Sequence, residues 1–197
     1  MTSDFRPGKQ SGDPSRRLRP LVTHSSSYSD IRLDFTPEAP PEPEARRSSL
    51  VLHYPLELGF IHIYLDDVDA AEQAPSAPLY LLLSRLAAGI SNLVDSQDIT
   101  GDWESDPWQI DIRGEAKRNR VYITLQSPPN NWIAMREVEV PLDRFAEEVL
   151  QVTKRWLEYL NSIYHDEIAD VDKGRFYRNM EQILKQQQQV LRDYRAR

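Results

Sequence analysis

A regular pattern of apolar residues predicts one long amphipathic helix between residues 142 and 164. Positions spaced by three or four residues form a single stripe, made of Leu142, Phe145, Val149, Val152, Trp156, Leu160 and Ile163. Leu150, Leu157 and Tyr164 form a second stripe beside it. A helix that is apolar over so much of its circumference must cover a sheet and also contact a further element.

Alternating apolar and polar residues predict several strands before this helix. Residues 31–35 alternate in this way, and residues 58–65 are apolar on both faces, as in a central strand. Residues 108–113 and 121–125 alternate again and are separated by a charged turn. The last three strands before the long helix should therefore form a meander.

The strand that leads into the long helix has a fault in its alternation. Ile133 and Met135 share one parity, whereas Val138 and Val140 share the other. A β-bulge near Arg136 would turn both pairs toward the core, because the extra residue of a bulge shifts the alternation by one.

Two further helices are predicted on either side of these strands. Residues 79–94 carry a continuous apolar face. Residues 176–194 repeat apolar side chains at roughly heptad spacing, with Gln186 to Gln189 on exposed and semi-exposed faces. An isolated helix of this length is only marginally stable in water, so it should dock on the rest of the chain, on a second copy or on a partner.

These elements predict an α+β fold, with a mainly antiparallel sheet of four to five strands covered by two helices, plus a C-terminal amphipathic helix. We expect a disordered basic tail at 1–27 and an α+β domain at 28–164. A proline- and glutamate-rich linker at 36–49 interrupts that domain, and residues 165–197 form a helical extension.

The composition of the chain bears on where in the cell the protein is expected to act. The chain has no cysteine, which excludes disulfides, cysteine-ligated metals and thiol catalysis. Its first residues lack the apolar segment of a signal peptide, and no apolar run approaches the roughly 18 to 20 residues of a membrane span. We therefore expect a soluble, cytoplasmic protein that does not act at a membrane.

The net charge of −7 is unevenly distributed. Residues 1–27 carry five basic and two acidic side chains, and residues 175–197 carry six and two, so residues 28–174 hold 13 basic and 27 acidic ones. Such an acidic body should repel the phosphates of nucleic acid. It suits a basic protein partner, although solubility alone is a sufficient reason for the charge.

Patterns that carry catalysis are scarce. None of the four histidines has a second histidine at metal-ligand spacing, and His62 in the central strand is expected to be a hydrogen-bonded structural residue. Aspartates at 66–69 and 95–106 could hold Mg²⁺ or Ca²⁺, but their spacing does not match an EF-hand loop. We predict that the chain is not an enzyme and has no cofactor or metal; a metal-dependent enzyme using these aspartates is the competing hypothesis.

Three tryptophans lie in or next to predicted turns: Trp103, Trp108 and Trp132. They either cap the ends of the sheet, which we favour, or form an aromatic patch that anchors a partner.

The order of a leucine-rich helix, a meander, and then EVPLDRFAEEVL at 139–150 with Trp156 resembles the small cytosolic immunity proteins of bacterial toxin systems. The resemblance covers residues 50–164. It implies an acidic sheet-and-helix body that neutralises a toxin by covering its active site, and it assigns a role to no particular residue.

The sequence thus favours a non-catalytic protein-binding domain of the immunity type that neutralises a basic partner. The candidate contacts are Asp102, Trp103, Glu104, Asp106, Trp108, Asp111, Glu137 and Glu139. The alternative is an acidic secretion or assembly chaperone, or an adaptor, that docks through its C-terminal helix. A homodimer formed through residues 175–195 is compatible with both.

Overall fold

The computed structural model describes residues 27–38, 58–72, 74–102, 108–127, 129, 132–169 and 174–197, and for 100–102, 166 and 167 it describes the backbone alone. Nearly all of the predicted tail at 1–27 and most of the predicted linker at 36–49 lie outside these residues. The first two linker positions, Thr36 and Pro37, belong to a strand instead.

The strands form two antiparallel sheets, each with four strands. Sheet A contains β5 (Ile99–Asp102), β6 (Gln109–Glu115), β7 (Arg120–Ser127) and β8 (Trp132–Pro141), paired in the order of the sequence. Sheet B contains β1 (Arg32–Pro37), β2 (Leu58–Leu65) and β3 (Val68–Asp69), and β4 (Ala77–Pro78) also pairs with β2. The α+β class is confirmed, and two sheets take the place of the one that the sequence predicted.

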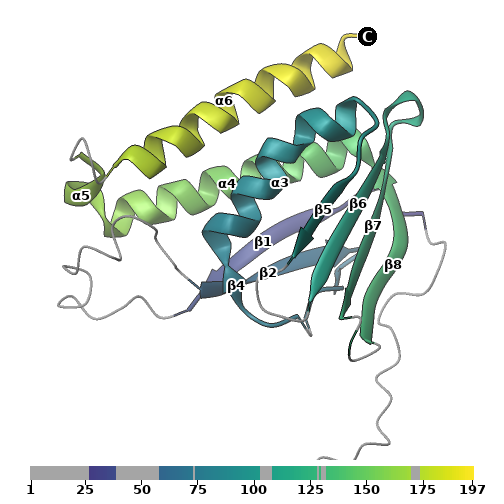
Figure 1. Cartoon of the computed structure of the whole chain (residues 1–197), viewed down its shortest axis with the longest axis horizontal. Coiled ribbons are helices and arrows are strands. Elements are labelled where there is room, and N and C mark those ends of the chain that lie inside the picture. Colours follow the sequence, from purple (N-terminus) through teal and green to yellow (C-terminus); the bar gives the residue numbers. More distant parts are fainter. Residues whose placement is uncertain are drawn as a thin grey trace, which may run out of the picture.

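A layer of two helices lies on both sheets (Figure 1). The helix α3 (Leu79–Val94) packs on β2, β5 and β6, and α4 (Leu142–Ile163) packs on β1, β7 and β8. The predicted apolar stripe of α4 is buried almost throughout, and Trp156 at its centre has no exposed surface. This explains the breadth of the stripe, because one helix has to cover strands of two sheets and a third helix.

That third helix, α6 (Arg175–Arg195), forms an outer layer on α3 and α4, beyond the short α5 (His165–Ala169) (Figure 1). Its buried side chains Met180, Leu184 and Leu191 belong to the same core as the sheets. Of the three docking modes that the sequence left open for this helix, the structure shows the first, in which the apolar stripe packs on the rest of the chain. Gln187, predicted to be at least partly exposed, is buried in this contact, and its Oε1 atom has no hydrogen-bond partner.

The predicted bulge in β8 is confirmed. Ile123 pairs with Val138 and Leu125 pairs with Met135, so Thr124 alone faces two residues, Arg136 and Glu137. Met135, Val138 and Val140 are all fully buried as a result. A second shift of register at the next pair explains why Ala134 is also buried, while Ile133 is only partly so.

The outer edge of β1 is closed by side chains of α4. The Leu33 amide donates to Glu148 Oε2 at 3.0 Å, and Arg155 donates to the Leu33 carbonyl at 2.6 Å. Side-chain partners of this kind occupy backbone groups that would otherwise offer an edge for pairing with another chain. Just before β1, the Tyr28 amide donates to the Glu139 carbonyl at the edge of β8, which links the N-terminal segment to sheet A.

As predicted, β2 is a central strand that pairs with β1, β3 and β4, but only one of its two apolar faces is buried. Its inward residues are buried, but Leu58 and Phe60 on the other face are 42% and 39% exposed. The turn after β2 places Asp66 and Asp67 at positive φ, as a two-residue hairpin of type I′ requires.

Within the described part of the chain, no helix is long and apolar enough to cross a membrane.

Candidate partner-binding face

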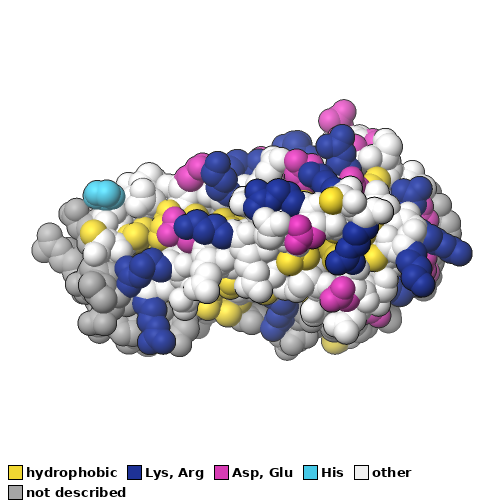
Figure 2. Space-filling model, turned by 90° about the horizontal axis from the view of Figure 1, so that it is seen from above, with side chains coloured by type: hydrophobic (Ala, Val, Ile, Leu, Met, Phe, Trp, Pro, Cys, Tyr) yellow, Lys and Arg dark blue, Asp and Glu magenta, His cyan; other side chains and the backbone are white. Residues whose placement is uncertain are grey.

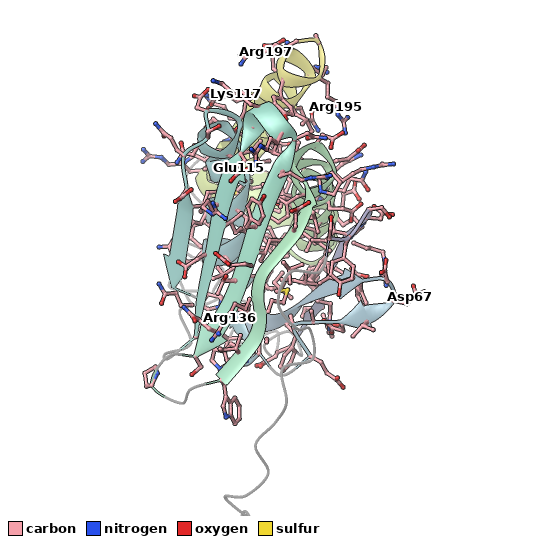
Figure 3. The ribbon with its side chains drawn as sticks, turned by 90° about the vertical axis from the view of Figure 1, so that its right-hand side faces the viewer. Asp67, Glu115, Lys117, Arg136, Arg195 and Arg197 are labelled. Atoms are coloured by element: carbon pink, nitrogen blue, oxygen red, sulfur yellow. The ribbon has the colours of Figure 1, made fainter. Side chains whose placement is uncertain are left out.

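Three of the predicted contact acids share the outer face of sheet A, the face turned away from the helices. Asp111 in β6 pairs with Thr124 in β7, and Tyr122 in β7 pairs with Glu139 in β8, so these side chains project from the same side. Figure 3 looks onto this face, with Glu115 near the turn that joins β6 to β7 and Arg136 farther down β8.

Glu137 lies in the bulge and projects from this face, in phase with Glu139. Its φ of 47° is unusual for a residue other than glycine, and its amide donates to Thr124 Oγ1 at 3.0 Å. The side chain is 65% exposed. Backbone of this kind costs of the order of 1–3 kcal/mol and is enriched at functional sites, where a bulge re-aims a side chain.

Asp98, Asp111 and Glu137 line one shallow hollow of about 270 Å³ on the outer face. Tyr122 and Thr124 contribute to its walls, and Arg113 is the one basic residue among those that line it. Three carboxylates against one guanidinium give this acidic hollow a local excess of negative charge. It is wide enough for the end of a lysine or arginine side chain.

Arg113 is held against one wall of the hollow. Its guanidinium lies 4.3 Å from the centre of the Tyr122 ring and forms an ion pair of 3.2 Å with Glu115, and it stands 4.0 Å from Glu137. Burial raises the pKa of the Tyr122 hydroxyl, Glu115 and Glu139 raise it further, and Arg113 and Arg118 oppose them. The phenol is therefore neutral at physiological pH and can donate a hydrogen bond to a ligand.

Of the other predicted contact residues, the structure describes the side chain of Trp108 alone. Trp108 is only 6% exposed, so it does not form an aromatic anchor on the surface as proposed from the sequence. It packs edge-on against Trp132, with ring centres 6.2 Å apart, and Trp132 is the exposed member of the pair at 43%. Trp103, Glu104 and Asp106 lie outside the described residues, and Asp102 is placed by its backbone pairing with Gln109.

Glu139 is on the predicted face but is already engaged. Arg120 Nε lies 2.9 Å from its Oε1 atom, and the Ser27 hydroxyl donates to the same oxygen at 3.0 Å. A partner would have to compete with both groups. We therefore place Glu139 at the rim of the candidate face rather than at its centre.

A second polar cluster joins the strands of sheet B. His62 Nε2 lies 2.9 Å from Thr36 Oγ1, and His62 Nδ1 lies 2.6 Å from Asp69 Oδ2. The other oxygen of Asp69 accepts from the amides of Ile63 and Ala71. His62 is thus a hydrogen-bonded residue, as predicted, and the cluster has the order of contacts of a hydroxyl–histidine–carboxylate triad.

Acyl transfer would also need amide donors near Thr36 to stabilise an oxyanion. The next residue, Pro37, has no amide hydrogen, the Glu38 amide donates to the Leu58 carbonyl, and the Phe35 amide donates to Asp34 Oδ1. The neighbouring donors are therefore occupied. We interpret the cluster as a clamp that fixes β1, β2 and β3 to one another.

Metal ligation was the competing hypothesis for the aspartates. In the part of the chain that the structure describes, no three histidine or acidic side chains are grouped closely enough to hold a metal ion. Asp66 and Asp67 form the tip of the hairpin turn, whereas Asp69 binds His62 and backbone amides. The turn thus separates side chains that are adjacent in the sequence.

Comparison with known proteins assigns no function to this face. No protein-family model, no curated protein and no solved structure matches the chain significantly.

Proposed function

We propose that this chain is a non-catalytic protein-binding domain that holds a basic segment of a partner protein on the outer face of sheet A. The observation that carries the proposal is the acidic hollow, where Asp98, Asp111 and Glu137 converge from three different segments. Glu137 stands in the bulge of β8 and projects outward in phase with Glu139, because Val138 and Val140 between them face the core.

The expected contact is a lysine or arginine side chain of the partner. Its stem would lie along Tyr122, and its charged group would meet Asp111 and Glu137, which in the free protein have only weak partners. Asp111 accepts from Gln109 Nε2 at 3.3 Å, and Glu137 is 4.0 Å from Arg113. Exposed Trp132 supplies an aromatic surface of the kind that often contributes most to affinity.

An inhibitor of the immunity type is the specific form that we favour. In the immunity proteins that the sequence resembles, an acidic body covers the active site of a toxin, and charge of this kind mainly accelerates association. The acidic excess in residues 28–174 suits such an encounter over distances of about a Debye length, roughly 10 Å at 0.1 M salt.

The test is affinity capture with matched baits, followed by binding kinetics at two salt concentrations. The altered bait carries Asp111→Asn and Glu137→Gln, and the control carries Asp67→Asn and Glu158→Gln, which remove the same charge elsewhere. A basic protein should be retained by the wild type and the control and lost by the altered bait. Recovery of acidic proteins only, equal recovery on all three baits, or an association rate that salt does not change would contradict the proposal.

The non-catalytic part has its own test at the clamp of Thr36, His62 and Asp69. Incubation with an activated ester should give no acylation of Thr36 in a mass spectrum. Ester hydrolysis that Thr36→Ala and His62→Ala both abolish would show that the clamp is a catalytic site.

A further inference from the structure

We infer that the acidic hollow takes up an arginine side chain of the partner rather than a lysine, and that this arginine replaces Arg113 on the ring of Tyr122. The inference rests on the proposed function and names the partner residue that the hollow selects. Arg113 sets that specificity, because it occupies the position that the partner has to fill.

Arg113 already places on the aromatic wall of the hollow the group that we expect from the partner. It pairs with Tyr122 across β6 and β7, and its guanidinium carbon lies 4.3 Å from the centre of the ring. The same guanidinium stands 4.0 Å from Glu137, and Asp111 projects from the same face of β6 two residues earlier. The free protein therefore shows that this wall accommodates a guanidinium stacked on tyrosine beside a carboxylate.

The contacts that hold Arg113 in this place are individually weak. Its side chain is 48% exposed, and exposed ion pairs and cation–π contacts each contribute little in water. Its shortest ionic contact, at 3.2 Å, is with Glu115, which projects from the same face of β6 two residues later. Arg113 can therefore leave Tyr122 and Glu137 while it keeps its ion pair with Glu115.

The chemistry of the position that Arg113 leaves selects arginine. A guanidinium is planar, stacks on aromatic rings and donates to two carboxylates at once, whereas an ammonium is a compact and strongly hydrated charge. Asp111 and Glu137 are the acceptors on either side of this position. Both have distant partners in the free protein, at 3.3 Å from Gln109 and 4.0 Å from Arg113, so both remain able to accept from an incoming guanidinium.

The charges around the hollow favour a cation from outside the chain. Arg120 on the same face is paired with Glu139 at 2.9 Å, and among the described residues Arg113 is the only basic one that lines the hollow. When Arg113 moves aside, the carboxylates of the hollow lose their one cation, which the partner's arginine restores. The surface over α6 has no such excess of one sign, because Figure 2 looks down on it and shows acidic and basic side chains interspersed.

Sheet B contains a matched control for Arg113. Arg32 pairs with Tyr64 across β1 and β2, lies 3.8 Å from the centre of its ring and forms an ion pair of 3.5 Å with Asp34, two residues later. This arrangement repeats that of Arg113, Tyr122 and Glu115 outside the acidic hollow. Arg32→Gln therefore removes the same charge and the same kind of stacking without uncovering the hollow.

The experiment titrates the full chain at low salt with two blocked glycine–serine peptides that differ only in a central arginine or lysine, and follows binding by NMR. The wild type should bind the arginine peptide about two- to fivefold more tightly than the lysine peptide, and Tyr122→Leu should lose this preference. Arg113→Gln should bind the arginine peptide about twofold or more tightly than the wild type does, and Arg32→Gln should bind it like the wild type. At saturation the side-chain N–H signal of Arg113 should move toward its position in Tyr122→Leu, because the guanidinium leaves the ring.

Failure of the inference can be distinguished from failure of the proposed function. Equal binding of the two peptides, weaker binding by Arg113→Gln, the same gain in Arg32→Gln, or an Arg113 signal that stays in place at saturation would overturn the inference alone. Binding of neither peptide, or binding that the pair Asp111→Asn and Glu137→Gln does not weaken, would contradict the proposed function and the inference with it. Circular dichroism checks that each variant folds.

Discussion

The two sheets share one helix layer but are assembled in different ways. Sheet A pairs its four strands in the order of the sequence, and its turns span only a few residues. Sheet B pairs β1 with β2 across residues 38–57, and β1 gains further bonds from α4, more than a hundred residues away. Local pairing closes small loops, whereas distant pairing must overcome a larger loss of chain entropy.

This difference suggests a hierarchy of stability. Sheet A with α3 and α4 should form the cooperative unit on which everything else docks, and β1 should be the strand that opens first. The candidate partner-binding face lies on the more stable unit, which suits a preformed recognition surface. The following predictions test that hierarchy, from the largest expected effect to the smallest.

Removing Trp156 should destabilise both sheets together. Trp156→Ala empties a fully buried site in the helix that covers strands of sheets A and B, and should lower the free energy of unfolding by about 3–5 kcal/mol. Denaturant titration provides the measurement. Trp132→Ala, at a half-exposed position, should cost about 1 kcal/mol or less. A similar loss in both variants would show that the shared layer is not the main core.

One glycine in each sheet allows a direct comparison. A methyl group on Gly114 would lie 2.8 Å from the Leu93 carbonyl oxygen, and one on Gly59 would lie 2.7 Å from the Thr36 carbonyl oxygen. Each alanine variant should lose about 1–3 kcal/mol, because backbone atoms have to move. Hydrogen exchange should show that Gly114→Ala weakens protection throughout the chain, and that Gly59→Ala weakens mainly β1 and β2. Reversed patterns would contradict the hierarchy.

Loss of the hydrogen bond between β1 and α4 should affect local opening of β1 more than the stability of the whole chain. Glu148→Ala leaves the Leu33 amide without its acceptor and should accelerate its hydrogen exchange, at a cost of about 1–2 kcal/mol. Glu158→Ala on the same helix removes an exposed acid and should leave Leu33 unchanged. Equal exchange of Leu33 in the two variants would mean that the bond does not hold the strand.

Tyr194 joins α6 to the turn between β6 and β7. Its hydroxyl donates to the Ala116 carbonyl at 2.7 Å, and Tyr194→Phe should lower stability by about 0.5–1.5 kcal/mol at neutral pH. Burial and then Asp143 raise the pKa of Tyr194 above its ordinary value of 10.0. A raised folded pKa gives stability that is complete below pH 10 and is lost as the pH rises through the folded value.

Denaturant titrations at pH 7, 10 and 11 test this dependence. The wild type should lose stability between pH 10 and 11, and the gap between it and Tyr194→Phe should narrow. Part of the decline should persist in the variant, because the pKa of Tyr177 is also raised by burial, by Glu181 and by Glu158. A gap that stays constant with pH would contradict the assignment to the Tyr194 hydroxyl.

Local patterns were sufficient to predict most elements of this fold. The bounds of α3 and β2 agree with the apolar runs, and α4 ends one residue before the predicted Tyr164. The strand β5 was missed because its surroundings, residues 95–106, are dominated by aspartate. The division into two sheets was not predictable either, since the alternation of a strand indicates which side chains are buried but not which strand lies beside it.

The candidate face shows the same limit. Parity predicts that Asp111, Glu137 and Glu139 project outward, and it also assigns Arg113 and Tyr122 to that face, although neither of these two was among the predicted contacts. The same parity places Trp108 on the buried face, because it alternates in phase with Ile110 and Ile112, and all three side chains are buried. The convergence of Asp98 on the hollow depends on tertiary packing and has no counterpart in the local sequence.

The bond between Leu33 and Glu148 has a consequence for synthesis on the ribosome. The two residues are 115 positions apart, so at about 5–20 residues per second the amide of Leu33 emerges roughly 6–23 s before its acceptor. During that interval β1 has an open edge that another nascent chain could pair with. A chaperone that binds exposed strands should therefore bind β1 first. Truncated chains that end before α4 should aggregate by pairing through this strand.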